Sequence, residues 1–234
     1  FSGTPCQVAG LYAIVDRHHE GLLTCDLLCY GVPSPGVFAD YVAYVESEFK
    51  TRLVDIDFRE KEYGWEKPRR VALLANGEEH EIVGGHDAYF AWFSSDITLR
   101  PVCYNCRYRT TRRVGDITLG DFWGIGTVVP FAHDTRYGVS LILLNSEKGK
   151  QMKKRMVELV YMEERTIDEA LMRNRLALAG HQPKPYGRER FFAAYNSYGI
   201  KRMAKRYGFE KTAKNLARIL IPSKVINFLS RHRA

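Results

Sequence analysis

The sequence has no run of about 20 uncharged apolar residues, and this absence excludes a helix that crosses a membrane. Its first residues, FSGTPC, contain neither a basic segment nor an apolar one, so they do not form a secretory signal peptide. They resemble the end of a strand, and we therefore expect a natural N-terminal segment to precede Phe1. No internal repeat and no low-complexity stretch is present in the 234 residues.

Cysteine is also scarce. The five cysteines are too few for a secreted disulfide scaffold, and an odd number with one C-x-x-C pair is typical of metal or redox use in a reducing compartment. We therefore expect a cytoplasmic protein. The seven histidines form no pair with ligand-like spacing, so none is assigned to a metal. No nucleic-acid recognition motif is present, and a nucleic-acid partner is not expected.

The net charge of +8 is distributed unevenly along the chain. Residues 151–234 contain 19 Lys and Arg against 7 Asp and Glu, whereas residues 1–150 contain 16 against 20. The end of the chain, residues 191–234, is predicted to form basic amphipathic helices. These helices could contact an anionic membrane surface or an acidic partner. The alternative is that they only expose a solvated face while docked on the rest of the protein.

Hydrophobic patterning predicts interleaved strands and helices, which is typical of an α/β fold. We expect a mixed β-sheet flanked by helices, with a cysteine-bearing loop and a helical C-terminal tail. Residues 1–190 are predicted to form one domain, followed by the basic tail at 191–234. The Asn76-Gly77 pair predicts a hairpin. Strands are expected at 22–30, 51–58, 70–75, 79–83, 117–121 and 139–145, and helices at 5–15, 38–49, 88–98, 149–160 and 168–178.

Four of the five cysteines could share one metal site. Cys103 and Cys106 form the C-x-x-C pair on a basic loop. Cys6 lies in the first turn of a predicted helix, where backbone N–H groups favour a thiolate, and Cys29 ends a predicted strand. Cys25 would lie about 13 Å from Cys29 along that strand, so it is left out. The spacing fits zinc as well as an iron–sulfur cluster, and buried free cysteines are a third interpretation.

Longer segments surround these cysteines: GTPCQVAGL at 3–11, DLLCYGVPSP at 26–35, LRPVCYNCRY at 99–108 and GDITLGDFWGI at 115–125. In this order, over roughly residues 1–195, they resemble the motifs of the coenzyme F420 hydrogenase/dehydrogenase beta-subunit family. Each cysteine of the family pattern has a counterpart here, and Cys25 falls where the family usually has an apolar residue. Two features depart from the family. Tyr30 replaces the usual histidine, which puts any proton transfer there in doubt, and the ferredoxin segment of longer members is not seen upstream.

The resemblance implies a 4Fe–4S cluster held by Cys6, Cys29, Cys103 and Cys106, next to FAD. The cluster would pass single electrons, and the flavin would convert them to hydride chemistry with coenzyme F420 or another acceptor. An electron-donating or electron-accepting protein, such as a ferredoxin-like domain or subunit, is the expected partner. We expect a pocket beside the cysteines, formed by Gly3–Gln7, Arg107–Arg113 and Asp121–Gly126. The expected cofactor contacts are Gly3, Thr4, Gln7, Arg107, Arg113, Asp121 and Trp123.

Each of these contacts also has a purely structural interpretation. Gly3 and Thr4 could only set the turn that orients Cys6, the arginines could belong to a solvated loop, and Trp123 could be a core residue. No catalytic residue is assigned. The alternative function is that of a non-catalytic interaction protein with a structural four-cysteine zinc site.

Overall fold

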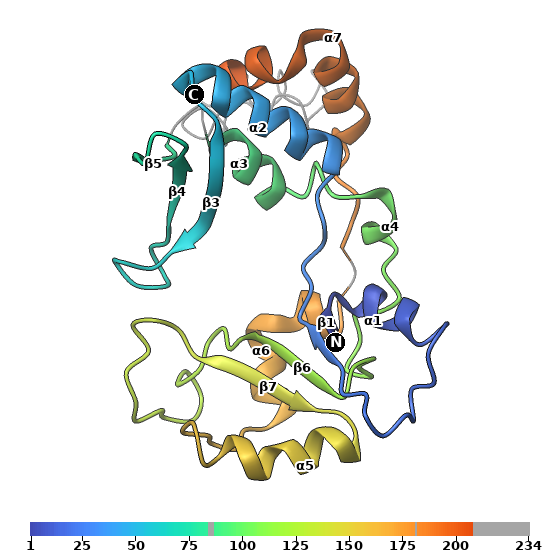
Figure 1. Cartoon of the computed structure of the whole chain (residues 1–234). Helices are drawn as coiled ribbons and strands as arrows, with labels where there is room; N and C mark the ends of the chain where they lie inside the picture. The colour runs from blue at the N-terminus through green and yellow to red at the C-terminus, as the bar shows by residue number, and fades with distance from the viewer. Residues whose placement is uncertain (84–86, 181, 208–234) are drawn as a thin grey trace, which may run out of the picture. The chain divides into compact units, whose positions relative to one another are not determined.

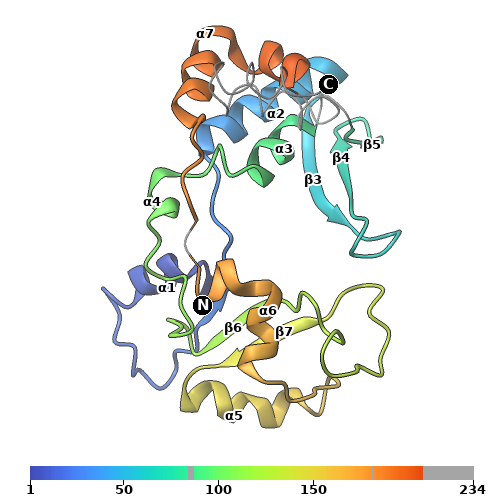
Figure 2. The same ribbon diagram turned by 180° about the vertical axis from the view of Figure 1, so that it is seen from behind.

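The computed structural model describes residues 1–83, 87–180 and 182–207, and these divide into two compact units. Unit 1 contains residues 1–31 and 105–182, and unit 2 contains residues 32–104 together with the chain from 183 onward. Each unit is therefore built from two separate stretches of the sequence. Figures 1 and 2 show the same ribbon from two sides, coloured along the chain.

Unit 1 is built on a four-stranded sheet in the order β1-β2-β6-β7. β1 (Ser2–Gly3), β2 (Cys25–Leu27) and β6 (Ile117–Asp121) are parallel, and β7 (Ser140–Leu144) is antiparallel to β6 at the edge. The helices of this unit are α1 (Pro5–Leu11), α5 (Glu147–Met156) and α6 (Ile167–Leu178). Ala170 and Leu178 of α6 pack against Phe122 and Leu141 in a small apolar core.

Unit 2 contains the antiparallel strands β3 (Leu53–Glu60), β4 (Arg69–Leu74) and β5 (Glu79–Glu81). Its helices are α2 (Pro35–Phe49), α3 (Ala88–Ser94), α4 (Pro101–Tyr104) and α7 (Arg188–Tyr207). The core is rich in aromatic residues: Trp92 packs edge-on against Phe191 and Tyr195, with ring centroids 5.2 and 5.9 Å away. Helices α2, α3 and α7 all contribute to this core.

The expected α/β class and the mixed sheet are confirmed, although the strands divide between two sheets. The predicted hairpin is present: Gly77 has a φ of +84° between β4 and β5, and Asn76 Oδ1 accepts the Glu78 N–H. The strand expected at 22–30 is shorter because only Cys25–Leu27 pair with neighbours.

The expected domain boundary at residue 190 falls inside α7, whose Phe191 and Tyr195 are buried in unit 2. These aromatic side chains belong to the core of unit 2, and the distribution of charge along the sequence, on which the expected boundary was based, does not reveal them.

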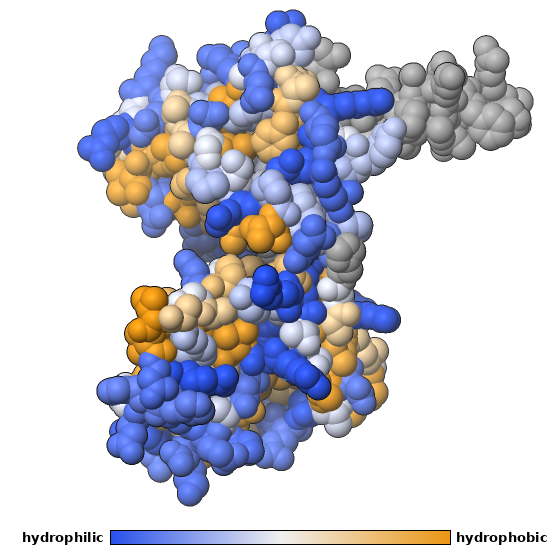
Figure 3. Space-filling model, turned by 90° about the vertical axis from the view of Figure 1, so that its right-hand side faces the viewer, coloured by the Kyte–Doolittle hydropathy of each residue, from blue (hydrophilic) through white to orange (hydrophobic). Residues whose placement is uncertain are grey.

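Most of the predicted basic tail, residues 208–234, lies outside the described residues, so its contact with a membrane or partner stays a prediction. No helix in the described part of the chain is long and apolar enough to span a bilayer. On the face seen in Figure 3, hydrophobic patches are interrupted by hydrophilic residues.

Candidate functional site

The carboxyl ends of three parallel strands meet at one edge of the sheet in unit 1. Gly3 of β1 pairs with Asp26 of β2, and Asp26 pairs with Thr118 of β6. Cys6 and Cys29 follow Gly3 and Asp26 by three residues each, so the two strands deliver both cysteines to the same edge. Open α/β sheets bind their ligands at this edge. Two further predicted contacts lie there as well, because Asp121 is the last residue of β6 and Trp123 follows it.

The turn before Cys6 is held by its own side chains. Gln7 Oε1 accepts hydrogen bonds from the Thr4 backbone N–H at 2.8 Å and from the Thr4 hydroxyl at 3.0 Å. The Thr4 hydroxyl also lies 3.2 Å from Cys6 Sγ. A Cβ atom at Gly3 would stand 3.0 Å from Gln7 Oε1, so a larger residue would crowd this turn. The observed contacts of Gly3, Thr4 and Gln7 thus position Cys6, and contact with a flavin stays a prediction for them.

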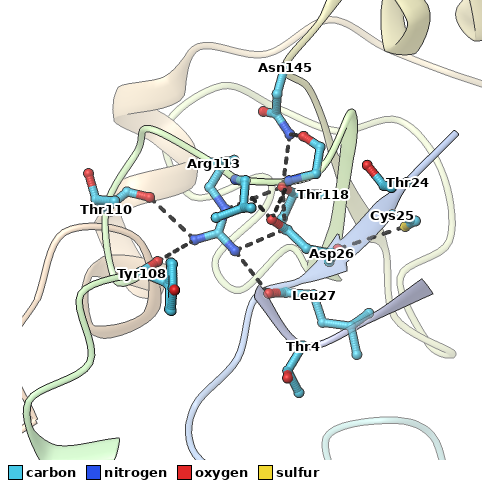
Figure 4. A network of polar contacts seen from close by, with 12 residues as sticks. Thr4, Thr24, Cys25, Asp26, Leu27, Tyr108, Thr110, Arg113, Thr118 and Asn145 are labelled. Carbon is cyan, nitrogen blue, oxygen red and sulfur yellow. Dashed lines mark hydrogen bonds and ion pairs between the residues drawn. The ribbon is translucent and has the colours of Figure 1, made fainter. Parts of the chain in front are cut away.

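Arg113 is the centre of a buried polar network (Figure 4). Its side chain is 1% exposed and forms an ion pair of 3.0 Å with Asp26, which is fully buried. Its remaining N–H groups donate to the Thr118 hydroxyl and to the carbonyl oxygens of Leu27, Tyr108 and Thr110. These bonds occupy all five donors of the guanidinium. In this arrangement no guanidinium donor of Arg113 is free for a phosphate, and its contact with a cofactor stays a prediction.

Two aspartates of the family-like motifs have structural partners in the same region. Asp26 accepts the backbone N–H groups of Val114 and Gly115 at 3.1 and 2.9 Å and the Thr118 hydroxyl at 2.6 Å. Asp116 accepts the backbone N–H and the hydroxyl of Thr24, both at 2.9 Å. These bonds join β2 to the start of β6 across about 90 positions of sequence.

Asp116 also accepts the Ser146 hydroxyl at 2.6 Å. Burial by itself raises the pKa of the Asp116 carboxyl, but the hydrogen bonds from Ser146 and Thr24 and the charge of Lys148 outweigh it, so the pKa is lowered. Asp116 is therefore held as a carboxylate.

Arg109 is an anchor that the sequence analysis did not identify. It is buried, and its guanidinium donates to Gln182 Oε1 at 2.8 Å, to the Leu176 carbonyl at 3.2 Å and to the Tyr30 carbonyl. These bonds tie the chain just after Cys29 to the end of α6. The sequence does not distinguish Arg109 from Arg107 and Arg112 nearby, which are exposed, so only the folded structure reveals its role.

Trp123, another predicted contact, is 40% exposed, and Asp121 is half-buried.

The cysteines are all free thiols. Cys103 belongs to unit 2, where its Sγ lies 3.5 Å from the Val32 backbone nitrogen, whereas Cys6, Cys29 and Cys106 belong to unit 1. Within the described residues, no three His, Cys, Asp or Glu side chains form a group that could hold a metal ion. The four-cysteine site therefore stays a prediction.

Cys25 differs from the other cysteines by its place inside β2, where it pairs with Ser2 and Ile117. Its thiol pKa is raised by burial and, to a smaller extent, by the neighbouring Asp26 carboxylate. A thiol with a raised pKa is a poorer metal ligand, because the thiolate is the form that binds.

A cavity of about 710 Å³ lies within unit 1. Its lining includes Thr111 from the expected segment Arg107–Arg113, and Phe122 and Ile125 from the expected segment Asp121–Gly126. It includes no residue of the third expected segment, the Gly3–Gln7 turn. Most of its wall is formed by β7 and by residues 161–167. The cavity therefore does not coincide with the pocket expected beside the cysteines, and that pocket stays a prediction.

Residues 1–170 match the family that comprises the C terminus of the coenzyme F420 hydrogenase/dehydrogenase beta subunit. The chain belongs to this family. Hydrogenases and dehydrogenases are oxidoreductases, so the family places the chain among proteins of redox chemistry. The match includes all five cysteines and ends inside α6, so α7 lies beyond it.

A solved structure of the F420-reducing [NiFe] hydrogenase complex from Methanosarcina barkeri contains a chain similar to this F420 hydrogenase/dehydrogenase family member. The two are 15% identical, with a TM-score of 0.43. The similarity covers 86% of this chain and 62% of that chain, so the present sequence corresponds to less than two thirds of its length. No curated protein matches the sequence significantly.

Proposed function

We propose that the chain is the core of an iron–sulfur flavoprotein that passes electrons between a 4Fe–4S cluster and FAD. Cys6, Cys29, Cys103 and Cys106 would hold the cluster, and electrons would continue to a hydride-accepting cofactor or substrate such as coenzyme F420. The observation that supports this most is the family match together with the arrival of Cys6 and Cys29 at one edge of the sheet in unit 1. When bound, the cluster supplies one-electron transfer and the flavin supplies hydride chemistry.

The chain's own residues would act by holding the thiols in place. Thr4 and Gln7 hold the turn of Cys6, and Arg109 holds the carbonyl of Tyr30, one residue after Cys29. Cys103 is the fourth thiol, and its Sγ contacts the backbone of Val32, three residues after Cys29 in the sequence. Because three residues span at most about 11 Å, the covalent chain limits the separation of Cys29 from that backbone.

The second half of the proposal concerns partners. A cluster that receives electrons one at a time needs a protein that supplies or removes them, and a ferredoxin-like domain or subunit has the required chemistry. Arg107 is exposed next to Cys106 and remains a candidate for contact with an anionic cofactor or partner. Asp121 and Trp123 remain candidates for flavin contact because Asp121 ends β6 and Trp123 follows it, at the end of the sheet to which Cys6 and Cys29 are delivered.

The test is anaerobic purification of the full-length protein, followed by iron, sulfide and flavin analysis. We expect about four iron atoms and four sulfides per chain, with an absorption band near 400 nm, and bound FAD. Serine variants of Cys6, Cys29, Cys103 and Cys106 should each lose most of the iron, and Cys25→Ser is the matched control that should retain it. Stoichiometric zinc in a colourless protein would instead favour the non-catalytic alternative, and an equal loss of iron in the control would reject this ligand set.

A further inference from the structure

Helix α4 of unit 2 carries Cys103, and it is too short to fix its own orientation. The helix contains only the four residues Pro101–Tyr104. A single helical turn fixes about six backbone dihedral angles for one hydrogen bond, so it is unstable unless neighbouring elements hold it. The direction of the Cys103 thiol is therefore set by contacts from outside α4.

The first of these contacts comes from the chain just before α2. Leu99 and Pro33 form an isolated antiparallel bridge, and the Arg100 N–H donates to the Val32 carbonyl at 2.8 Å. The Val32 N–H in turn donates to Cys103 Sγ at 3.5 Å. These contacts fasten α4 and the residues before it, whereas the last residue of the helix needs an anchor of its own.

Arg188, the first residue of α7, supplies this anchor. Its Nε donates to the Tyr104 hydroxyl at 3.1 Å, and its Nη2 donates to the Leu99 carbonyl at 3.2 Å. The guanidinium carbon also lies 5.6 Å from the centroid of the Tyr104 ring. One side chain therefore binds the chain on both sides of Cys103.

The surroundings of Arg188 favour a fixed geometry. Tyr104 is 3% exposed, and its hydroxyl, which accepts from Arg188, also donates to the Asp96 carbonyl at 2.5 Å. The ring of Phe192, one turn further along α7, lies 4.5 Å from the guanidinium carbon of Arg188. Because the helix dipole disfavours a cation at the first position of a helix, the stability of α7 does not account for this arginine.

We infer that Arg188 is a positioning residue for Cys103, which it keeps in a fixed orientation by holding α4 through Tyr104 and Leu99. The family match ends at residue 170, before α7, so the resemblance does not supply this role. For iron binding the inference rests on the proposed function, in which Cys103 is a cluster ligand. A loosened α4 would then release iron faster, because a ligand must stay within about 0.5 Å of its productive position.

Hydrogen exchange in the full chain, prepared without iron, tests the positioning of α4 independently of the cluster. The readout is deuterium uptake in a peptide that contains residues 98–104, compared with uptake in β4 of the same unit. Arg188→Gln removes the guanidinium, and Tyr104→Phe keeps the ring and removes only the hydroxyl. Arg188→Lys is the conservative variant, and Arg190→Gln is the matched control because Arg190 is exposed on the same helix.

We expect Arg188→Gln and Tyr104→Phe each to raise exchange in residues 98–104 about tenfold while β4 is unchanged, because each removes a hydrogen bond that holds α4. Arg188→Lys should give a smaller increase, and Arg190→Gln should match the wild type. In anaerobically prepared protein, the rate of iron loss to a chelator should rise about tenfold in the same two variants and remain unchanged in the control.

Unchanged exchange in either variant overturns the inference, and so does an equal rise in β4, which would mean that Arg188 only stabilises unit 2. Faster exchange without faster iron loss would also reject the role toward the cluster. If the wild type holds no iron but exchange responds as described, the positioning of Cys103 stands and the proposed function fails. If all variants keep about four iron atoms with unchanged exchange, the proposed function stands and the inference fails.

Discussion

Replacing Asp26 by asparagine should destabilise unit 1 strongly. Asp26 is fully buried and accepts four hydrogen bonds of 2.6–3.1 Å, one of them from the buried guanidinium of Arg113. The asparagine keeps the shape of the side chain, but it removes the negative charge and replaces one acceptor oxygen by an NH2 group. Arg113 is then left as a buried cation without a counter-charge.

The magnitude follows from these contacts. Breaking a buried ion pair by removing one partner costs about 3–5 kcal/mol, and hydrogen bonds to a charged acceptor contribute about 1.5–3 kcal/mol each. The cost of the broken ion pair already includes the hydrogen bond between Arg113 and Asp26, so the two costs are not added. We therefore expect a total loss of about 3–5 kcal/mol in the free energy of unfolding. The assay is urea denaturation followed by circular dichroism at pH 7, with the midpoint and slope fitted separately because the two units need not unfold together.

The control is an exposed ion pair, between Lys150 and Glu147. Lys150 and Glu147 are paired at 2.6 Å with side chains 60% and 80% exposed, so Glu147→Gln should cost less than about 1 kcal/mol. The reasoning would be refuted if Asp26→Asn cost no more than this control. That result would mean that the network tolerates a neutral residue, and that the motif aspartate is retained for some other reason than stability.

Further predictions concern glycine packing, pH and the aromatic core. In Gly149→Ala the new Cβ would lie 2.3 Å from the Asp116 carbonyl oxygen, so α5 must shift, and thermal unfolding should show a loss of about 1–3 kcal/mol. Because the folded-state pKa of Asp116 is lowered, its contribution to stability is present above the ordinary aspartate pKa and is lost as the pH falls through the folded value. Asp116→Asn should therefore flatten the fall in urea midpoint below about pH 4, and an unchanged profile would contradict this. Trp92→Ala should cost about 3–5 kcal/mol in unit 2 by the same assay, because Trp92 is fully buried against Phe191.

Local features of the fold were predictable from the sequence. The hairpin at Asn76-Gly77 depends on one glycine with positive φ, and β7 lies in a mainly apolar segment, so neighbouring residues specify each of them. The N-terminal turn before Cys6 was predictable for the same reason. The family motifs also located the two cysteines that the sheet of unit 1 delivers to one edge.

Long-range pairing was not predictable in this way. Arg113 was expected on a ligand-binding loop, but its partner Asp26 lies 87 positions away, and only the folded chain shows that all its donors are used. Arg109 was not singled out for a similar reason, since its partners lie at Tyr30 and Gln182. In α7, buried aromatic residues alternate with exposed cations, so the charge of the sequence does not show which of its residues pack into unit 2.

The interleaving of the two units has a consequence for synthesis on the ribosome. Asp26 and its partner Thr118 in β6 are 92 positions apart, because the first stretch of unit 2 lies between them in the chain. At about 5–20 residues per second, β2 waits roughly 5–18 s after its own translation before β6 is available. Unit 2 waits longer still, because Phe191 and Tyr195 of its core are translated after unit 1 is complete. Neither nascent core can therefore close early, because unit 1 requires translation through α6 and unit 2 requires translation of α7.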